Sequence, residues 1–448
     1  MKELKTLLYV VIAAVFFIGL FMLSDRFADD IHTEFGSLIG SPVQEGDSDS
    51  DQPVRPQDLQ IEQSILQESE NAFSSEITIT VAGDILCQEQ QLINAYNEEA
   101  DSFDFTECFQ YIRDMLKDAG FSAATLKTTM AGQWNGYDNT FNGYTCYMGY
   151  YNSPETLADA IADCGIDLLN TANSHSLDSG ADGVFTTIDT LSGAGISHVG
   201  TAKGENDSKD YILTQDGISI AFTGWTSGTD DMSVGDEYSY AVNSLDENDH
   251  KKISAMCRHI TELQEKNDFV IVMLDFGSSD SSTIESEQRK LAEETAKAGA
   301  DVILGTGSIS VKPMDVITYT DDDGFEYQSI VFYGLGDLIS SELYSDYEYE
   351  ELPVDFGMLL GLHIKRSIGG LLLLSSVDVY PTYIDWTDDV VRTIPALKAL
   401  SMGQFQGLIS EDEKTRLESG PEALMENLLS DTGFSYTLEG DHFNVRIE

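Results

Sequence analysis

The chain has 448 residues, enough for one large core or two domains with tails, and its 42% hydrophobic content is ordinary for a globular protein. Its charge is unusual, because 78 acidic residues outnumber 24 basic ones and give a net charge of −54. That balance argues against nucleic acid as a partner, since binding it depends on lysine and arginine side chains that neutralise phosphates.

The N-terminus contains an apolar run at residues 6–23. Roughly 20 apolar residues span a bilayer, whereas the apolar core of a secretory signal is usually about 7–15 residues long. No small-x-small cleavage signal and no lipobox cysteine follow the run, so we expect an uncleaved transmembrane signal anchor. Lys2 and Lys5 precede it, which predicts that residues 1–5 are cytoplasmic and that the rest of a single-pass protein lies outside the cell membrane.

Residues 24–75 are polar, carry few aromatic side chains and include an Asp- and Ser-rich stretch, as is typical of a disordered spacer. Three aspartates within 47–51 resemble the start of an EF-hand loop, but the sixth loop position, which requires glycine, is Gln52. We therefore interpret 24–75 as an acidic stalk and not as a calcium site.

Strand-like and helix-like patterns alternate after the stalk, beginning with the β-branched stretch 76–83. The other predicted strands cover 121–126, 166–171, 218–224, 269–275, 301–304, 328–333 and 357–365. The predicted helices cover 105–118, 154–163, 182–193, 248–266 and 284–298. This alternation predicts an α/β layered fold, with βαβ units in its first half and an antiparallel pair within 357–378.

Short helical patterns at 393–402 and 411–429 follow this region. We interpret 386–448 as a C-terminal helical appendage and 76–385 as the main domain. Between two strand-like runs, Asp321-Asp-Asp-Gly324 indicates a hairpin turn and not a metal site. Five cysteines lack the Cys-x-x-Cys spacing of a zinc ribbon, and most are expected to be small core residues.

The segment 170–180 contains the most informative polar residues of the chain. The hydrophobic run 165–169 leads into it, so it reads as a strand that ends in a polar loop. Polar residues at the carboxyl end of such a strand are where α/β folds place their chemistry. The candidate site residues of this loop are Asn173, Ser174, His175 and Asp178.

Five motifs occur in the order found in one known family. They are Gly83-Asp84, Asn173-Ser-His-Ser-Leu-Asp-Ser-Gly180, the glycine-rich segment 191–200, Gly299-Ala-Asp-Val-Ile-Leu-Gly305 and Gly334-Leu-Gly-Asp-Leu338. In these motifs, residues 77 to 385 resemble the CapA-type proteins of poly-γ-glutamate capsule synthesis. The resemblance implies a metallo-dependent-phosphatase-like αββα sandwich and a role in the synthesis of a capsule or cell-envelope polymer.

The family's metal-binding motifs are altered in this chain. A site for two divalent ions needs a bridging carboxylate and several His, Asp or Asn ligands from different strand ends. Where the family has Asn-Leu-Glu, this chain has Thr125-Leu-Lys127, and an ammonium group repels a cation. Ser174 replaces an asparagine, Asp275 replaces the histidine of His-Trp-Gly, and Thr306 lies where the family has a histidine-rich loop.

The number and positions of the histidines lead to the same conclusion without the resemblance. Of seven histidines, only His175 lies in a strand-end loop with acidic or Asn neighbours. The others are predicted in the stalk, in a surface helix, in strands or near the C-terminus: His32, His198, His250, His259, His363 and His442. A histidine-rich centre for two metal ions cannot be assembled from this set.

A polar pocket without a metal ion is therefore expected, formed by Asp84, Lys127, Asn173, Ser174, His175, Asp178, Asp275 and Thr306. Each role has an alternative. Asp84 is either a carboxylate ligand or a turn residue. Lys127 either replaces a cation among carboxylates or extends to solvent beside a collapsed pocket. His175 is either a catalytic residue or a buried loop residue, and Asp178 is expected to cap the following helix.

An aromatic-rich stretch at 134–151 has two interpretations. Its rings could stack on a ligand such as a sugar, or they could belong to an insertion that packs against the domain.

The leading hypothesis is a membrane-anchored, extracytoplasmic CapA-like protein without cofactor that binds or scaffolds in capsule or cell-envelope polymer assembly. Its expected partners are the membrane, through the N-terminal helix, and the polymer or capsule-assembly proteins. The competing hypothesis is an active metal-dependent hydrolase of phosphoesters or peptide-like bonds. In it, Asp84, Asp178 and Asp275 bind one divalent cation and His175 acts as general acid or base.

Overall fold

The computed structural model describes most of the chain after residue 72. The described residues are 73–117, 119–133, 141–147, 149–230, 232–245, 250–279, 282–320, 326–341, 354–367, 372–387, 389–401, 403–405, 407 and 409–447. They belong to one compact unit, Glu70–Glu448. The predicted cytoplasmic segment, anchor and most of the stalk lie outside these residues. Within the described part, none of the helices is long and apolar enough to cross a membrane.

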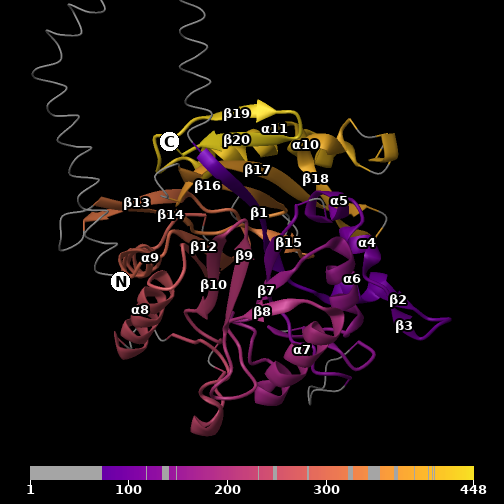
Figure 1. Ribbon diagram of the computed structural model, residues 1–448. Helices are drawn as coiled ribbons and strands as arrows, with labels where there is room; N and C mark the ends of the chain where they lie inside the picture. The colour runs from indigo at the N-terminus through magenta and orange to yellow at the C-terminus, as the bar shows by residue number, and fades with distance from the viewer. Residues whose placement is uncertain are drawn as a thin grey trace, which may run out of the picture. The chain divides into compact units, whose positions relative to one another are not determined.

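The larger of two β-sheets has the strand order β19-β20-β17-β16-β1-β4-β7-β8, with β15 beside β1 and β18 beside β17 (Figure 1). Its strands are β1 (Phe73–Ile85), β4 (Ser122–Leu126), β7 (Leu168–Asn170), β8 (Ser197–Val199), β15 (Asp337–Ile339), β16 (Phe356–Ser367), β17 (Leu372–Thr387), β18 (Val390–Pro395), β19 (Tyr436–Glu439) and β20 (His442–Arg446). Strands β1, β4, β7 and β8 run parallel, whereas β16 and β17 form an antiparallel pair. Both arrangements confirm the predicted topology.

The smaller sheet has the order β13-β14-β12-β11-β10-β9, with parallel inner strands and an antiparallel strand at each edge. Its strands are β9 (Asp210–Gln215), β10 (Ile218–Thr226), β11 (Phe269–Ser279), β12 (Val302–Ser308), β13 (Met314–Thr320) and β14 (Glu326–Phe332). The antiparallel pairing of β13 with β14 agrees with a hairpin, although its turn at 321–325 lies outside the described residues.

The described helices are α3 (Glu89–Ala95), α4 (Thr106–Phe109), α5 (Arg113–Lys117), α6 (Thr156–Cys164), α7 (Gly180–Ala194), α8 (His250–Gln264), α9 (Ser286–Lys297), α10 (Ala396–Ala399) and α11 (Glu411–Leu428), with 3₁₀ turns η1 (Asp236–Tyr238) and η3 (Gly403–Phe405). Most of them cover the outer faces of the two sheets, whereas α10 and α11 contribute side chains to the core between the sheets. Two short hairpins complete the fold: β2 (Tyr96–Asn97) with β3 (Ser102–Phe103), and β5 (Thr145–Tyr147) with β6 (Tyr150–Asn152). The single helix predicted at 105–118 is instead two short helices, α4 and α5.

Alternation along the strands separates the layers. Ile79 and Val81 of β1 pack with Ile271 and Met273 of β11 in the core between the sheets, while Ala82 faces the opposite way, toward the helices of the larger sheet. Side chains from α8 and α9 cover the outer face of the smaller sheet. The packing is therefore helix, sheet, sheet, helix, the predicted αββα order.

The C-terminal segment differs from the prediction of a helical appendage. Strand β18 pairs with β17 over residues that include the first three of the predicted helix 393–402, and β20 pairs with β17 further along. Among the described residues of this segment, the α-helices are α10 and α11, and Leu424 and Met425 of α11 join the core between the sheets. Residues 390–446 are therefore part of the main domain, because their apolar side chains complete its core.

Candidate functional site

The carboxyl ends of parallel strands from both sheets meet at one edge of the core. Asp84 ends β1, Lys127 follows β4, and Asp275 and Thr306 lie in register on the neighbouring strands β11 and β12. Asp84, Asp275 and Thr306 each follow, two or three positions later, a residue of the core between the sheets, such as Val81 or Met273. The strand topology therefore directs these polar side chains toward the space between the sheets, as α/β folds do at strand ends.

Lys127 lies buried against Asp84. The lysine is 2% exposed, and its Nζ is 3.5 Å from Asp84 Oδ2. Burial raises the pKa of Asp84 to about 6, an effect that Lys127 reduces and Asp275 reinforces. Burial alone lowers the pKa of Lys127, but the surrounding carboxylates outweigh it and hold that pKa above its ordinary value. The side chain does not extend to solvent, and it remains an ammonium.

Asp84 also accepts a hydrogen bond from the other sheet. Gly307 N donates to its Oδ2 at 2.9 Å. Gly307 has a φ of +93°, and a Cβ at this position would lie 2.7 Å from the carbonyl oxygen of Gly277. Only glycine therefore brings this amide to the carboxylate, so the loop that replaces the histidine-rich motif has its own structural requirement.

Two further carboxylates surround the lysine. Asp275 is fully buried, its Oδ1 accepts hydrogen bonds from Gly277 N at 2.9 Å and Thr226 Oγ1 at 3.3 Å, and burial raises its pKa against the effect of Lys127. Asp337 lies beside Asp84 in the parallel pairing of β15 with β1, and its charge also raises the pKa of Lys127. Asp337 belongs to a recognised sequence motif but was not predicted as a site residue, because only the strand pairing places it next to Asp84.

Several buried oxygen atoms of this cluster have no hydrogen-bond partner among the described residues. They are Asp84 Oδ1, Asp275 Oδ2, Ser174 Oγ and Thr306 Oγ1. Buried polar atoms are normally satisfied by protein or by water. These four atoms can therefore hydrogen-bond with water.

The loop after β7 is shaped by its own side chains. Asn173 Oδ1 accepts a hydrogen bond from His175 N at 2.9 Å, and its Nδ2 donates to the carbonyl of Leu126 at 2.6 Å. Ser176 Oγ accepts from Asn173 N at 2.8 Å and donates to Thr171 O. Asn173 thus ties this loop to the end of β4, next to Lys127, and its amide is used for structure.

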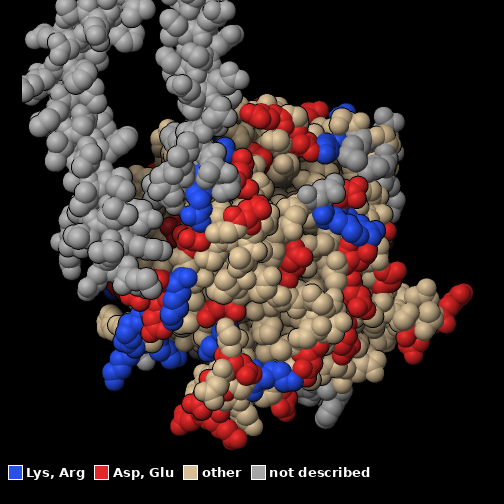
Figure 2. Space-filling model, in the orientation of Figure 1, with Lys and Arg blue, Asp and Glu red and all other residues tan. Residues whose placement is uncertain are grey.

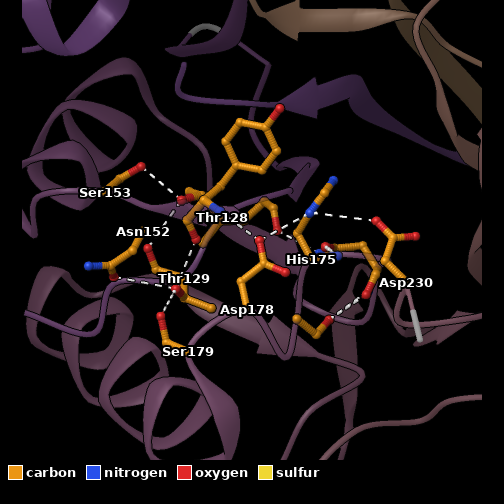
Figure 3. Close-up of polar contacts among 12 residues, drawn as sticks. Thr128, Thr129, Asn152, Ser153, His175, Asp178, Ser179 and Asp230 are labelled. Atoms are coloured by element: carbon orange, nitrogen blue, oxygen red, sulfur yellow. Dashed lines mark hydrogen bonds and ion pairs between the residues drawn. The ribbon is translucent and has the colours of Figure 1, made fainter. Parts of the chain in front are cut away.

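His175 and Asp178 face each other on this loop (Figure 3). His175 Nδ1 lies 3.1 Å from Asp178 Oδ2 and 3.9 Å from Asp230 Oδ2. The imidazole packs edge-on against the ring of Tyr151, with 4.7 Å between the ring centroids. Asp178 Oδ2 also accepts a hydrogen bond from Tyr151 N at 2.6 Å. Burial raises the pKa of Asp178, and the contact with His175 opposes that rise. His175 also acts on Asp275, whose pKa it lowers.

The prediction that Asp178 caps the next helix is wrong. Helix α7 has Ser179 at its N-cap, without a side-chain capping bond. The carboxylate of Asp178 instead holds the strand β6 and the imidazole of His175. Asp178 has this role because the backbone N–H of Tyr151 in β6 lies next to it in the fold. The local sequence contains no signal for that contact.

Hydroxyl groups of the segment after β4 contact both the loop after β7 and the edge of the β5–β6 hairpin (Figure 3). Thr128 Oγ1 lies 2.8 Å from Ser153 Oγ, and Thr129 Oγ1 lies 2.8 Å from Ser179 Oγ. Ala131 N donates to the side chain of Asn152. Of the aromatic stretch 134–151, Phe141 and Tyr144 pack against the helices of the larger sheet, as the packing interpretation predicts, whereas 134–140 and 148 lie outside the described residues.

The residues of this pocket do not fit a pair of divalent ions. In the described part of the chain, no three His, Cys, Asp or Glu side chains are arranged to bind one ion. The alternative ligand set of Asp84, Asp178 and Asp275 is therefore not assembled. An ammonium 3.5 Å from Asp84 Oδ2 adds repulsion toward any cation that approaches this carboxylate.

A family model matches the sequence over more than half of the chain. Residues 78–342 match the model of the bacterial capsule synthesis protein PGA_cap, a range that includes every residue of the pocket. The chain belongs to this family. The strands β16 to β20, which complete the larger sheet, follow the matched range.

Two curated relatives are proteins of capsule formation. The chain is 21% identical over 274 residues to the PGA biosynthesis protein CapA of Bacillus subtilis, covering 61% of this chain and 65% of that protein. It is 22% identical over 270 residues to the capsule biosynthesis protein CapA of Bacillus anthracis, covering 59% and 60%. The match thus spans less than two thirds of either relative.

Two solved structures share a distant likeness. One is a putative 5′-nucleotidase from Staphylococcus aureus, and the match covers 78% of this chain and 58% of that protein, at 10% identity and a TM-score of 0.42. The other is the calcineurin-like phosphoesterase YfkN from Bacillus subtilis, and the match covers 68% of this chain and 90% of that protein, at 12% identity and a TM-score of 0.40. At these TM-scores the likeness says nothing about the chemistry of this chain.

Proposed function

We propose that this protein is a non-catalytic member of the capsule synthesis family, which acts by binding or scaffolding in the assembly of a capsule or cell-envelope polymer. The observation that carries the proposal is the burial of Lys127 against Asp84, with Asp275 and Asp337 close enough to raise its pKa. In a hydrolase of two metal ions, the cations stabilise the attacking and leaving oxygens. Lys127 supplies one positive charge, but it offers no open coordination position for a substrate oxygen.

The energetics of burial support this reading. Three carboxylates that lose their water need compensation, since an unpaired buried charge costs several kcal/mol. A permanently charged ammonium provides part of it, and the hydrogen bonds from Gly307 and Gly277 provide more. The cluster is then a stable part of the fold, and its carboxylates are less available to a metal ion.

The cellular location belongs to the same proposal. The apolar run 6–23 with Lys2 and Lys5 before it supports a single-pass anchor, with the folded domain outside the membrane. Acidic side chains are spread over the face shown in Figure 2, with basic side chains in fewer groups. A net charge of −54 repels an anionic polymer such as polyglutamate, so we infer contact through partner proteins or bridging cations.

Metal analysis of the purified full-length protein tests the proposal. After incubation with manganese or zinc and removal of free ions, the wild type is expected to hold much less than one ion per chain and to leave phosphodiester substrates intact. The variant Lys127→Glu, which restores a carboxylate, is expected to bind metal more tightly than the wild type. One tightly bound ion in the wild type, with turnover that is lost in His175→Ala, would instead establish the hydrolase.

A cellular experiment separates binding from catalysis. Cells whose only copy carries Asp84→Ala or His175→Ala are expected to make normal amounts of polymer, provided that immunoblots show normal protein levels. Loss of polymer at normal protein levels contradicts the proposal, because a scaffold does not depend on these two side chains.

A further inference from the structure

A groove of about 530 Å³ lies on the face of the larger sheet that points away from the smaller sheet. Its floor is formed by Thr78, Thr80, Gly361, His363, Asp378 and Tyr380 of β1, β16 and β17. Helix α5 contributes Asp114 to one wall, and Lys398 and Asp441 come from the C-terminal segment. Clefts of about 300–1,000 Å³ are the size in which proteins bind small molecules. No residue of this groove belongs to the Lys127 cluster.

The middle of the floor is open because of one glycine. Gly361 pairs with Thr80 on one side and with Asp378 on the other. It carries no side chain, and a Cβ there would lie 3.3 Å from Asp378 Cβ. A larger side chain at Gly361 therefore extends into the groove, where it displaces any ligand.

His363 lies on the floor of the groove, between two carboxylates. Its Nε2 lies 2.9 Å from Asp378 Oδ2, and its Nδ1 lies 3.1 Å from Glu76 Oε1. Nδ1 also lies 3.2 Å from Thr78 Oγ1, and the imidazolium is the form that donates to both carboxylates at once. The hydrogen bond to Asp378 is the main reason that the pKa of His363 is raised, although burial opposes it.

The same chain of contacts continues to the C-terminal strands. Asp378 Oδ1 accepts a hydrogen bond from Asn444 Nδ2 at 2.7 Å, and His442 Nε2 lies 3.5 Å from the same oxygen. Asp441 pairs with Lys398. Charges of both signs thus alternate along the groove and pair with one another.

This pattern determines the class of ligand. The carboxylates of Asp378 and Asp441 are paired with His363 and Lys398, so a charged ligand has to compete with an existing ion pair. A neutral molecule with many hydroxyl groups avoids that competition, since it donates to remaining carboxylate lone pairs and accepts from lysine and threonine. Tyr380, half-buried beside His442, adds an aromatic ring of the kind that packs against a sugar.

We propose that this groove binds a neutral sugar residue, with its hydroxyl groups bonded to Asp114, Asp378 and Lys398. This is a second site, and it does not depend on the role of Lys127. A protein at the cell envelope would use it to hold a glycan during polymer assembly.

Saturation-transfer difference NMR of the full-length protein tests the site, with glucose and N-acetylglucosamine as neutral probes, and glutamate and glucosamine as charged ones. The neutral sugars are expected to show transfer to their ring protons. Gly361→Val is expected to abolish it, and Asp114→Asn to weaken binding about tenfold, as expected for a hydrogen bond to a charged group.

The matched control is Asp159→Asn, an exposed aspartate on α6 outside the groove, which is expected to leave the transfer unchanged. Asp114 is exposed as well, so its substitution tests the groove even where Gly361→Val disturbs the fold. Absence of transfer to both neutral sugars overturns the proposal, as does transfer only to glutamate or only to glucosamine. Equal transfer in wild type and Asp114→Asn, with circular dichroism showing both folded, also overturns it.

Discussion

Two charged clusters lie on opposite faces of the same sheet, and both use strand β1. At its end, Asp84 contacts Lys127, whose side chain is 3% exposed; at its start, Glu76 contacts His363, whose side chain is 20% exposed. The first cluster has three carboxylates buried around one cation, and the second lies beside a groove open to water. Deep burial calls for a cation that keeps its proton at every physiological pH, whereas a wetter position accommodates one that titrates.

The largest effect is expected from removing the inner cation. Lys127→Met leaves Asp84, Asp275 and Asp337 without their ammonium, so the free energy of unfolding should fall by about 3–5 kcal/mol. Urea unfolding of the full-length protein at pH 7.5 measures it. Lys252→Met, at an exposed lysine of α8, should change it by less than about 0.5 kcal/mol. A loss below about 1 kcal/mol for Lys127→Met contradicts a stabilising role of this ammonium among the buried carboxylates.

A second substitution is expected to restore part of this loss. In Lys127→Met with Asp84→Asn, one of the unpaired charges is gone, and about 1–3 kcal/mol should return relative to Lys127→Met alone. The double-mutant cycle in urea unfolding gives this coupling energy. Strict additivity of the two single changes contradicts a direct interaction between Lys127 and Asp84.

The outer cluster is expected to give a smaller effect that depends on pH. The pKa of His363 is raised in the folded state, so its stabilisation is complete below the unfolded value of about 6.5 and is lost as pH rises through the folded value. The difference in unfolding free energy between wild type and His363→Gln should therefore shrink from pH 6 to pH 9. We expect at most about 1 kcal/mol, because Glu76 is half exposed and solvent screens the pair. A difference that stays constant or grows with pH contradicts the imidazolium.

The errors of sequence interpretation come from contacts between residues that are distant in the chain. Residues 390–395 pair with β17 as a strand, although an apolar spacing typical of a helix extends from 393 to 402. A short strand at a sheet edge is decided by its neighbour, and its own sequence carries little signal. Asp178 and Asp337 were misassigned or missed for the same reason, since Tyr151 and Asp84 approach them only in the fold.

The groove on the outer sheet face could not be predicted from any motif. Thr80, Gly361, Asp378 and Asn444 are distant in the chain and lie side by side only through strand register. Likewise, the contact of His363 with both Glu76 and Asp378 requires three strands in one alignment. The sequence pattern predicts that His363 lies in a strand, and it carries no signal for these two contacts.

The amino-acid sequence alone determined the family, the order of most strands and helices, and the presence of a lysine where a carboxylate ligand is usual. These features are local or follow from the periodicity of side chains along an element, so they can be read along the chain. Only the tertiary structure decided that Lys127 is buried against Asp84, that Asp178 contacts the imidazole of His175, and that β1, β16 and β17 form a polar groove. Burial and cross-strand contact depend on how elements pack, and single-sequence patterns carry that information weakly.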